Sequence, residues 1–73
     1  MFSLYTRYRL LHELMALLEL AMGRVPAAEA APLEQCLRKI EGICQAGVEA
    51  ACGIDVEALS STVRALVREQ VRR

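Results

Sequence analysis

The chain contains few of the groups from which most active sites are built. Its 73 residues include no tryptophan, one phenylalanine, two tyrosines, one histidine and, among nine acidic residues, a single aspartate. A nucleophilic or paired-carboxylate site needs more such groups within reach of one another, and no glycine-rich phosphate-binding motif is present. We therefore expect no enzymatic activity, no cofactor and no metal site. The sequence also has no run of 18 apolar residues, which excludes a membrane-spanning helix.

The three cysteines, Cys36, Cys44 and Cys52, are an odd number and follow one another at intervals of eight residues. This spacing fits neither a disulfide framework nor a common zinc-binding pattern. We interpret them as reduced thiols that pack as small apolar side chains, which is typical of a cytoplasmic protein. An intermolecular disulfide through Cys52 is the alternative.

What the chain does have is aliphatic surface and balanced charge. It is 55% hydrophobic but only 4% aromatic, so its core must consist of leucine, valine, isoleucine, alanine and methionine, as in helical bundles. Nine basic and nine acidic residues give a net charge of zero, which argues against a protein that wraps nucleic acid over its whole surface. A single domain over residues 1–73 buries only about 60–65% of its unfolded surface, so association is expected to supplement its stability.

Apolar periodicity predicts three helices, and local signals mark their ends. The expected ranges are about 3–22, 32–52 and 55–71. Gly23 ends the first helix, Pro32 suits the first turn of the second, and Asp55 is a good N-cap for the third. Short connections between three amphipathic helices predict an all-α fold. It is either a three-helix bundle or a helical hairpin with a third helix, completed by dimerisation.

The second helix contains two glycines, and the sequence leaves its continuity open at one of them. Its apolar pattern continues through Gly42 and Gly47, which favours one helix despite a cost of about 1 kcal/mol for each interior glycine. We interpret Gly47 as a small residue that lets another helix approach closely. A break at Gly47 is the alternative.

The first helix has more apolar surface than one partner covers. One stripe comprises Leu4, Leu11, Met15, Leu18 and Met22, and a second stripe beside it comprises Leu10, Leu14, Leu17 and Ala21. Together they span roughly half of the helix circumference, whereas a single core usually takes a stripe only a little over about 100° wide. We assign the first stripe to the chain's own core and the second to another chain.

These features favour a protein-interaction module: a small regulator, antiactivator or chaperone-like adaptor that forms a helical dimer and binds a partner protein through apolar helix faces. Tyrosine and arginine often dominate interface energetics, so Tyr5, Tyr8 and Arg9 are candidate anchors for the interaction of the first helix. The candidate interaction residues are Tyr5, Tyr8, Arg9, Leu10, Leu14, Leu17 and Ala21. Self-association and partner binding demand the same residues, and the sequence does not separate them.

A row of arginines near the end of the chain supports a second hypothesis. Arg64, Arg68 and Arg72 recur at every fourth position of the third predicted helix, and Arg73 follows. Such a row can contact an anionic partner, so a small dimeric nucleic-acid-binding regulator is the alternative function. An acidic protein surface or a solvated face without a partner would explain the same residues.

Overall fold

The computed structural model describes residues 3–72, and they form an all-α fold, as predicted. The elements are α1 (Leu4–Met22), the 3-10 turn η1 (Ala27–Glu29), α2 (Ala31–Ala46), α3 (Val48–Cys52) and α4 (Val56–Arg72). No strand occurs in this part of the chain. Residues 1, 2 and 73, including the predicted anion contact Arg73, lie outside the described residues.

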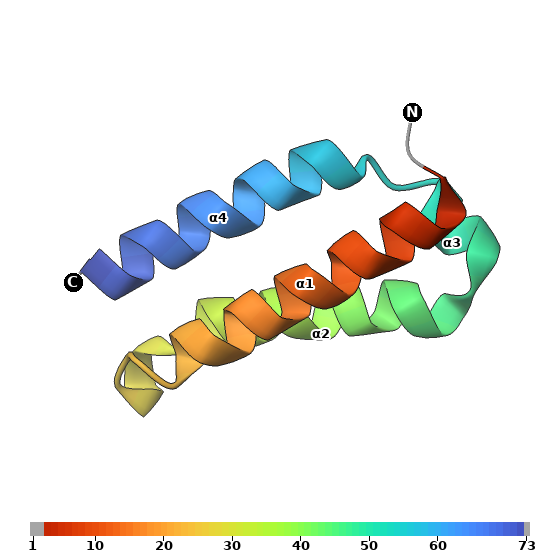
Figure 1. Ribbon diagram of the computed structural model, residues 1–73. Coiled ribbons are helices and arrows are strands. Elements are labelled where there is room, and N and C mark those ends of the chain that lie inside the picture. The colour runs from red at the N-terminus through yellow and green to blue at the C-terminus, as the bar shows by residue number, and fades with distance from the viewer. Residues whose placement is uncertain (1–2, 73) are drawn as a thin grey trace.

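Helix α1 is the centre of the arrangement, because it packs against both α2 and α4 (Figure 1). The chain runs along α1, returns along α2 in the opposite direction, and then runs along α4 in the direction of α1. The short α3 lies at the turn between α2 and α4, against α1. Helices α2 and α4 touch each other much less than either touches α1.

The helix ends follow the local chemistry of the sequence. Ser3 caps α1, because its Oγ accepts a hydrogen bond from the Thr6 N–H at 3.2 Å. Asp55 caps α4 in the same way, accepting from the Ala58 N–H at 3.1 Å, and so confirms the predicted cap. Pro32 stands in the first turn of α2, where its missing N–H leaves no helical hydrogen bond unmade.

The prediction of one continuous helix over 32–52 is wrong. Helix α2 ends at Ala46, and Gly47 adopts φ 103° and ψ −169° before α3 begins at Val48. This backbone conformation is essentially restricted to glycine, so Gly47 separates α2 from α3 instead of lining a helix contact. A Cβ at Gly47 would meet nothing within 4 Å, which also removes the close-packing explanation for the glycine.

The core is formed mainly by α1, with contributions from each of the other helices. Its buried hydrophobic residues are Leu11, Leu14, Leu18 and Ala21 of α1, Ala30 just before α2, Leu33 and Ile40 of α2, Ala51 of α3, and Val56 and Val63 of α4. Cys36, Cys44, Leu59 and Leu66 are partly buried against this cluster. Aliphatic side chains thus fill the interior, as the composition predicts.

The division of α1 into an inner stripe and an outer stripe needs correction. Leu14 and Ala21, assigned to another chain, are only 1% and 2% exposed within this one. Leu4, assigned to the core, is 36% exposed, while Leu10 and Leu17 are half-buried. The reason is that α1 lies between α2 and α4, so two helices of its own chain cover a wide apolar arc.

A hydrogen bond that the sequence did not predict ties the start of α1 to the start of α4. The Arg7 Nη1 atom donates to the backbone carbonyl of Ile54 at 2.8 Å, in a partly buried position. Ile54 lies in the connection between α3 and α4. This contact fixes the α3–α4 connection against α1, and it places α4 alongside α1 from its first turn.

A bilayer span would need a longer uninterrupted apolar helix than any that residues 3–72 form. Helix α1 is the longest at 19 residues, and its sequence is interrupted by Arg7, Arg9, Glu13 and Glu19.

Candidate functional site

The predicted interaction residues are spread along α1 from Tyr5 to Ala21, and they differ in exposure. Tyr5 is 75% exposed and Arg9 is also exposed, whereas Tyr8 is half-buried and packs against the core cluster. Leu17 and Ala21 lie three to four turns away, at the other end of the helix. The structure therefore does not bring all of these residues into one surface.

An apolar groove lies between the C-terminal halves of α1 and α4. It is lined by Leu17, Leu20, Ala21, Arg24, Val67, Arg68, Val71 and Arg72, and it encloses about 530 Å³ while remaining open to solvent. Leu20 is 68% exposed and Val71 is 41% exposed, although both are large hydrophobic residues. This concave apolar surface is called the α1–α4 groove below.

Leu20 was missed as a site residue, and the reason is positional. It belongs to neither of the two apolar stripes of α1, so periodicity assigns it no partner. It follows Leu17 by three residues and precedes Arg24 by four, which places the three side chains along one side of the helix. A leucine that lies outside both stripes, on the same side of the helix as Leu17 and Arg24, was the signal that could have identified Leu20 as a site residue.

Three arginines border the α1–α4 groove. Arg24 comes from the segment after α1, and Arg68 and Arg72 come from the last turns of α4. No acidic side chain is among the lining residues. Within residues 3–72, none of the three takes part in an ion pair. The groove therefore combines an apolar floor with a positively charged rim.

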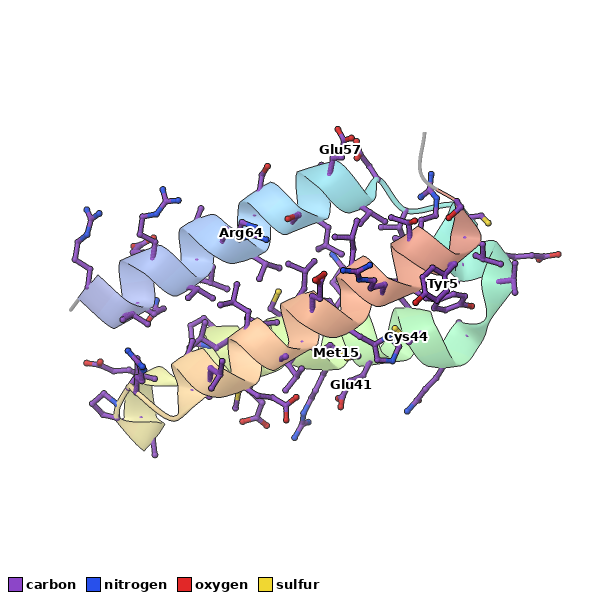
Figure 2. The ribbon with its side chains drawn as sticks, in the orientation of Figure 1. Tyr5, Met15, Glu41, Cys44, Glu57 and Arg64 are labelled. Atoms are coloured by element: carbon purple, nitrogen blue, oxygen red, sulfur yellow. The ribbon has the colours of Figure 1, made fainter. Side chains whose placement is uncertain are left out.

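The predicted arginine row is divided by the structure. Arg68 and Arg72 line the α1–α4 groove, but Arg64 does not. The Arg64 Nε atom instead donates to Ser60 Oγ on the preceding turn, at 3.2 Å. Arg64 lies in the middle of α4, as Figure 2 shows, and it is exposed.

The residues most suited to catalysis make contacts with backbone. The His12 Nδ1 atom donates to the backbone carbonyl of Tyr8 at 2.8 Å on the exposed side of α1. Asp55 is the N-cap of α4. Over residues 3–72, no three His, Cys, Asp or Glu side chains gather closely enough to hold a metal ion.

The three cysteines are free thiols in different surroundings. Cys36 and Cys44 are partly buried, and Cys52 is exposed at the end of α3. Burial raises the pKa of the Cys36 thiol, an effect that nearby Lys39 partly offsets, and burial also raises the pKa of the Cys44 thiol. The thiolate is the reactive form of cysteine, so these two residues are the less reactive ones.

This difference predicts stepwise labelling by dithionitrobenzoate. At about pH 8, we expect about one thiol per chain, Cys52, to react at least about tenfold faster than the other two. Absorbance of the released thionitrobenzoate measures the rates, and Cys52→Ser is expected to remove the fast phase alone. Three equal rates in the folded protein would contradict this assignment, and denaturant should make all three thiols react quickly.

Comparison of the chain with models of protein families, with curated proteins and with solved structures gives no match. No activity, ligand or partner can therefore be transferred to it from a relative. The geometry and charge of the α1–α4 groove are the features of the chain that bear on its function.

Proposed function

We propose that this chain is a small non-enzymatic protein-interaction module that binds a partner protein through the α1–α4 groove. The observation that carries the proposal is the exposure of Leu20 and Val71 beside half-buried Leu17 and Val67, on one concave surface. Concave apolar surfaces between helices are the usual receptors for helical segments of partner proteins. Regulators, antiactivators and chaperone-like adaptors act in this way.

Burial of the exposed apolar side chains of the groove by a partner would contribute favourable free energy to binding. Full burial of a leucine or valine side chain contributes about 1.5–3 kcal/mol, and Leu20 retains 68% of its exposure. Covering Leu20 therefore contributes on the order of 1–2 kcal/mol, and Val71 adds a smaller amount. Leu14 does not line the groove, and Ala21, which does, is only 2% exposed and leaves almost no area for a partner to cover.

Homodimerisation stays a prediction with a smaller set of residues. Burial of Leu14 and Ala21, together with the place of Leu17 in the groove, leaves four candidate self-association residues in the first half of α1: Tyr5, Tyr8, Arg9 and Leu10. Sedimentation at micromolar concentration is expected to give twice the chain mass of 8.1 kDa. A folded monomer would contradict this part of the proposal and leave partner binding at the groove intact.

Site-specific photocrosslinking tests partner binding. Replacing Leu20 with photoreactive benzoylphenylalanine and irradiating a native lysate is expected to give a discrete adduct with a second protein. The matched control carries the same group at Glu57, which is exposed in the first turn of α4 and points away from α1 (Figure 2). It should give no such adduct.

Three results would overturn the proposal. The first is absence of any adduct at Leu20. The second is the same adducts from both positions, which would indicate unspecific contact. The third is an adduct of two copies of this chain alone, which would make the groove a self-association surface.

A further inference from the structure

The rim of the α1–α4 groove carries charge of one sign, and we infer from it that the groove receives an acidic amphipathic helix of the partner. This inference rests on the proposed function and adds the chemistry of the partner. The apolar side chains of that helix would lie on Leu17, Leu20 and Val71. Its flanking carboxylates would meet Arg24, Arg68 and Arg72.

Charge complementarity is the first argument. Arg24, Arg68 and Arg72 come from two separate segments, yet they border the same apolar surface. Within residues 3–72, none of them has an acidic ion-pair partner, whereas Arg38 on α2 pairs with Glu34 at 2.7 Å. Arg68 and Arg72 are also four residues apart on one helix face, where like charges repel, and the one acidic side chain beside them, Glu69, lines the adjoining hollow and not the groove. Carboxylates of a partner would relieve this repulsion.

The same charges disfavour a second copy of this chain in the groove. A two-fold symmetric dimer brings identical surfaces together, so each arginine rim would face the other. Such an interface would gather six arginines around an apolar centre without any acidic lining residue. Like charges placed opposite one another across an interface are strongly unfavourable.

The apolar floor disfavours nucleic acid as the occupant. A phosphate backbone would contact Arg68 and Arg72, but it offers nothing apolar to cover Leu20 and Val71, which are 68% and 41% exposed. The chain as a whole has zero net charge, so it lacks the broad positive surface that attracts duplexes. An occupant with both apolar and acidic groups matches the groove better.

The dimensions of the groove favour a helix. Its lining on α1 and the following segment runs from Leu17 to Arg24, a rise of about 10 Å at 1.5 Å per residue. This is about two turns, enough for apolar anchors at positions i, i+3, i+4 and i+7 of a docked helix. Because α1 and α4 run side by side, a helix lying between them would extend the bundle by one more member (Figure 1).

Binding of designed peptides to the full chain tests the inference. Three helical peptides of about 18 residues share one leucine stripe and carry glutamate, glutamine or lysine on the flanks. Fluorescence anisotropy is expected to show the tightest binding for the glutamate peptide, weaker binding for the glutamine peptide and the weakest for the lysine peptide. Raising the ionic strength from about 0.05 to about 0.5 M should weaken binding of the glutamate peptide and reduce the differences in affinity among the three peptides.

Two arginine variants provide a matched comparison on the same helix. Arg68→Gln is expected to weaken binding of the glutamate peptide about twofold to threefold, as for the loss of one exposed ion pair. Arg64→Gln removes the same charge outside the groove and should leave the affinity unchanged. Combining Arg24→Gln, Arg68→Gln and Arg72→Gln should weaken binding about tenfold, while circular dichroism stays that of the parent.

The outcomes separate this inference from the proposed function. No binding of the glutamate peptide, equal affinity for all three peptides, or equal loss in Arg64→Gln and Arg68→Gln would each overturn the inference. Retardation of a duplex DNA of about 20 base pairs at about 50 mM salt, without peptide binding, would overturn it in favour of nucleic acid. A protein crosslinked through Leu20 that binds the triple variant as tightly as the parent would preserve the proposed function and overturn only the acidic partner.

Discussion

Replacing Leu14 with alanine is expected to lower the free energy of unfolding by about 2–5 kcal/mol, because the substitution leaves a cavity in a fully packed interior. Leu14 is 1% exposed and belongs to the core cluster together with Leu11 and Leu18. A domain of this size has a total stability of about 4–11 kcal/mol, so one substitution removes a large part of it. Urea denaturation followed by circular dichroism measures the loss.

Leu20→Ala is the matched control, since it removes the same atoms from the same helix at a site that is 68% exposed. Its effect on the free energy of unfolding should stay within about 0.5 kcal/mol. The pair therefore distinguishes a core residue from a groove residue. A Leu14→Ala variant that unfolds like the parent but sediments at half its mass would show that Leu14 serves a dimer seam after all.

The helix ends were predictable from the sequence because the groups that make them are close together along the chain. The Asp55 side chain reaches the N–H of Ala58, three residues later, without help from any other segment. Pro32 at the start of α2 is equally local, since it supplies a fixed φ angle and lacks an N–H. Such features depend little on how the helices finally pack.

The coverage of α1 was not predictable in the same way. Periodicity indicates that Leu14 and Ala21 are buried, but it does not identify which chain buries them. That answer depends on α4 running alongside α1 as a second neighbour in addition to α2, and the Arg7 contact to the Ile54 carbonyl helps to hold it there. A hydrogen bond between residues 47 positions apart leaves no signal in a helical wheel.

The α1–α4 groove illustrates the same limit for the candidate site. The arginine row on α4 was visible in the sequence, but its relation to Leu20 and Arg24 was not. Only the packing of α4 beside α1 turns a basic helix face and an isolated leucine into one amphipathic surface. The chemistry of the site is thus a property of the assembled bundle rather than of either helix.

The two glycines of the predicted second helix, Gly42 and Gly47, are expected to respond to substitution by alanine with opposite changes in stability. Gly42 lies inside α2, is exposed, and a Cβ there would meet nothing within 4 Å. Gly42→Ala is therefore expected to raise the free energy of unfolding by about 0.5–1 kcal/mol, since alanine loses less backbone freedom in a helix. Thermal denaturation should show a higher midpoint for this variant.

Gly47→Ala is expected to act in the opposite direction and lower the free energy of unfolding by about 1–3 kcal/mol, because alanine strongly disfavours φ 103° with ψ −169°. Space is not the cause, since a Cβ at Gly47 also meets nothing within 4 Å. The two variants add the same methyl group to the same stretch of chain, so their difference isolates the backbone angle at the α2–α3 break. If both substitutions were stabilising, α2 and α3 would form the single helix that the apolar pattern alone favours, and α3 would not turn at Gly47.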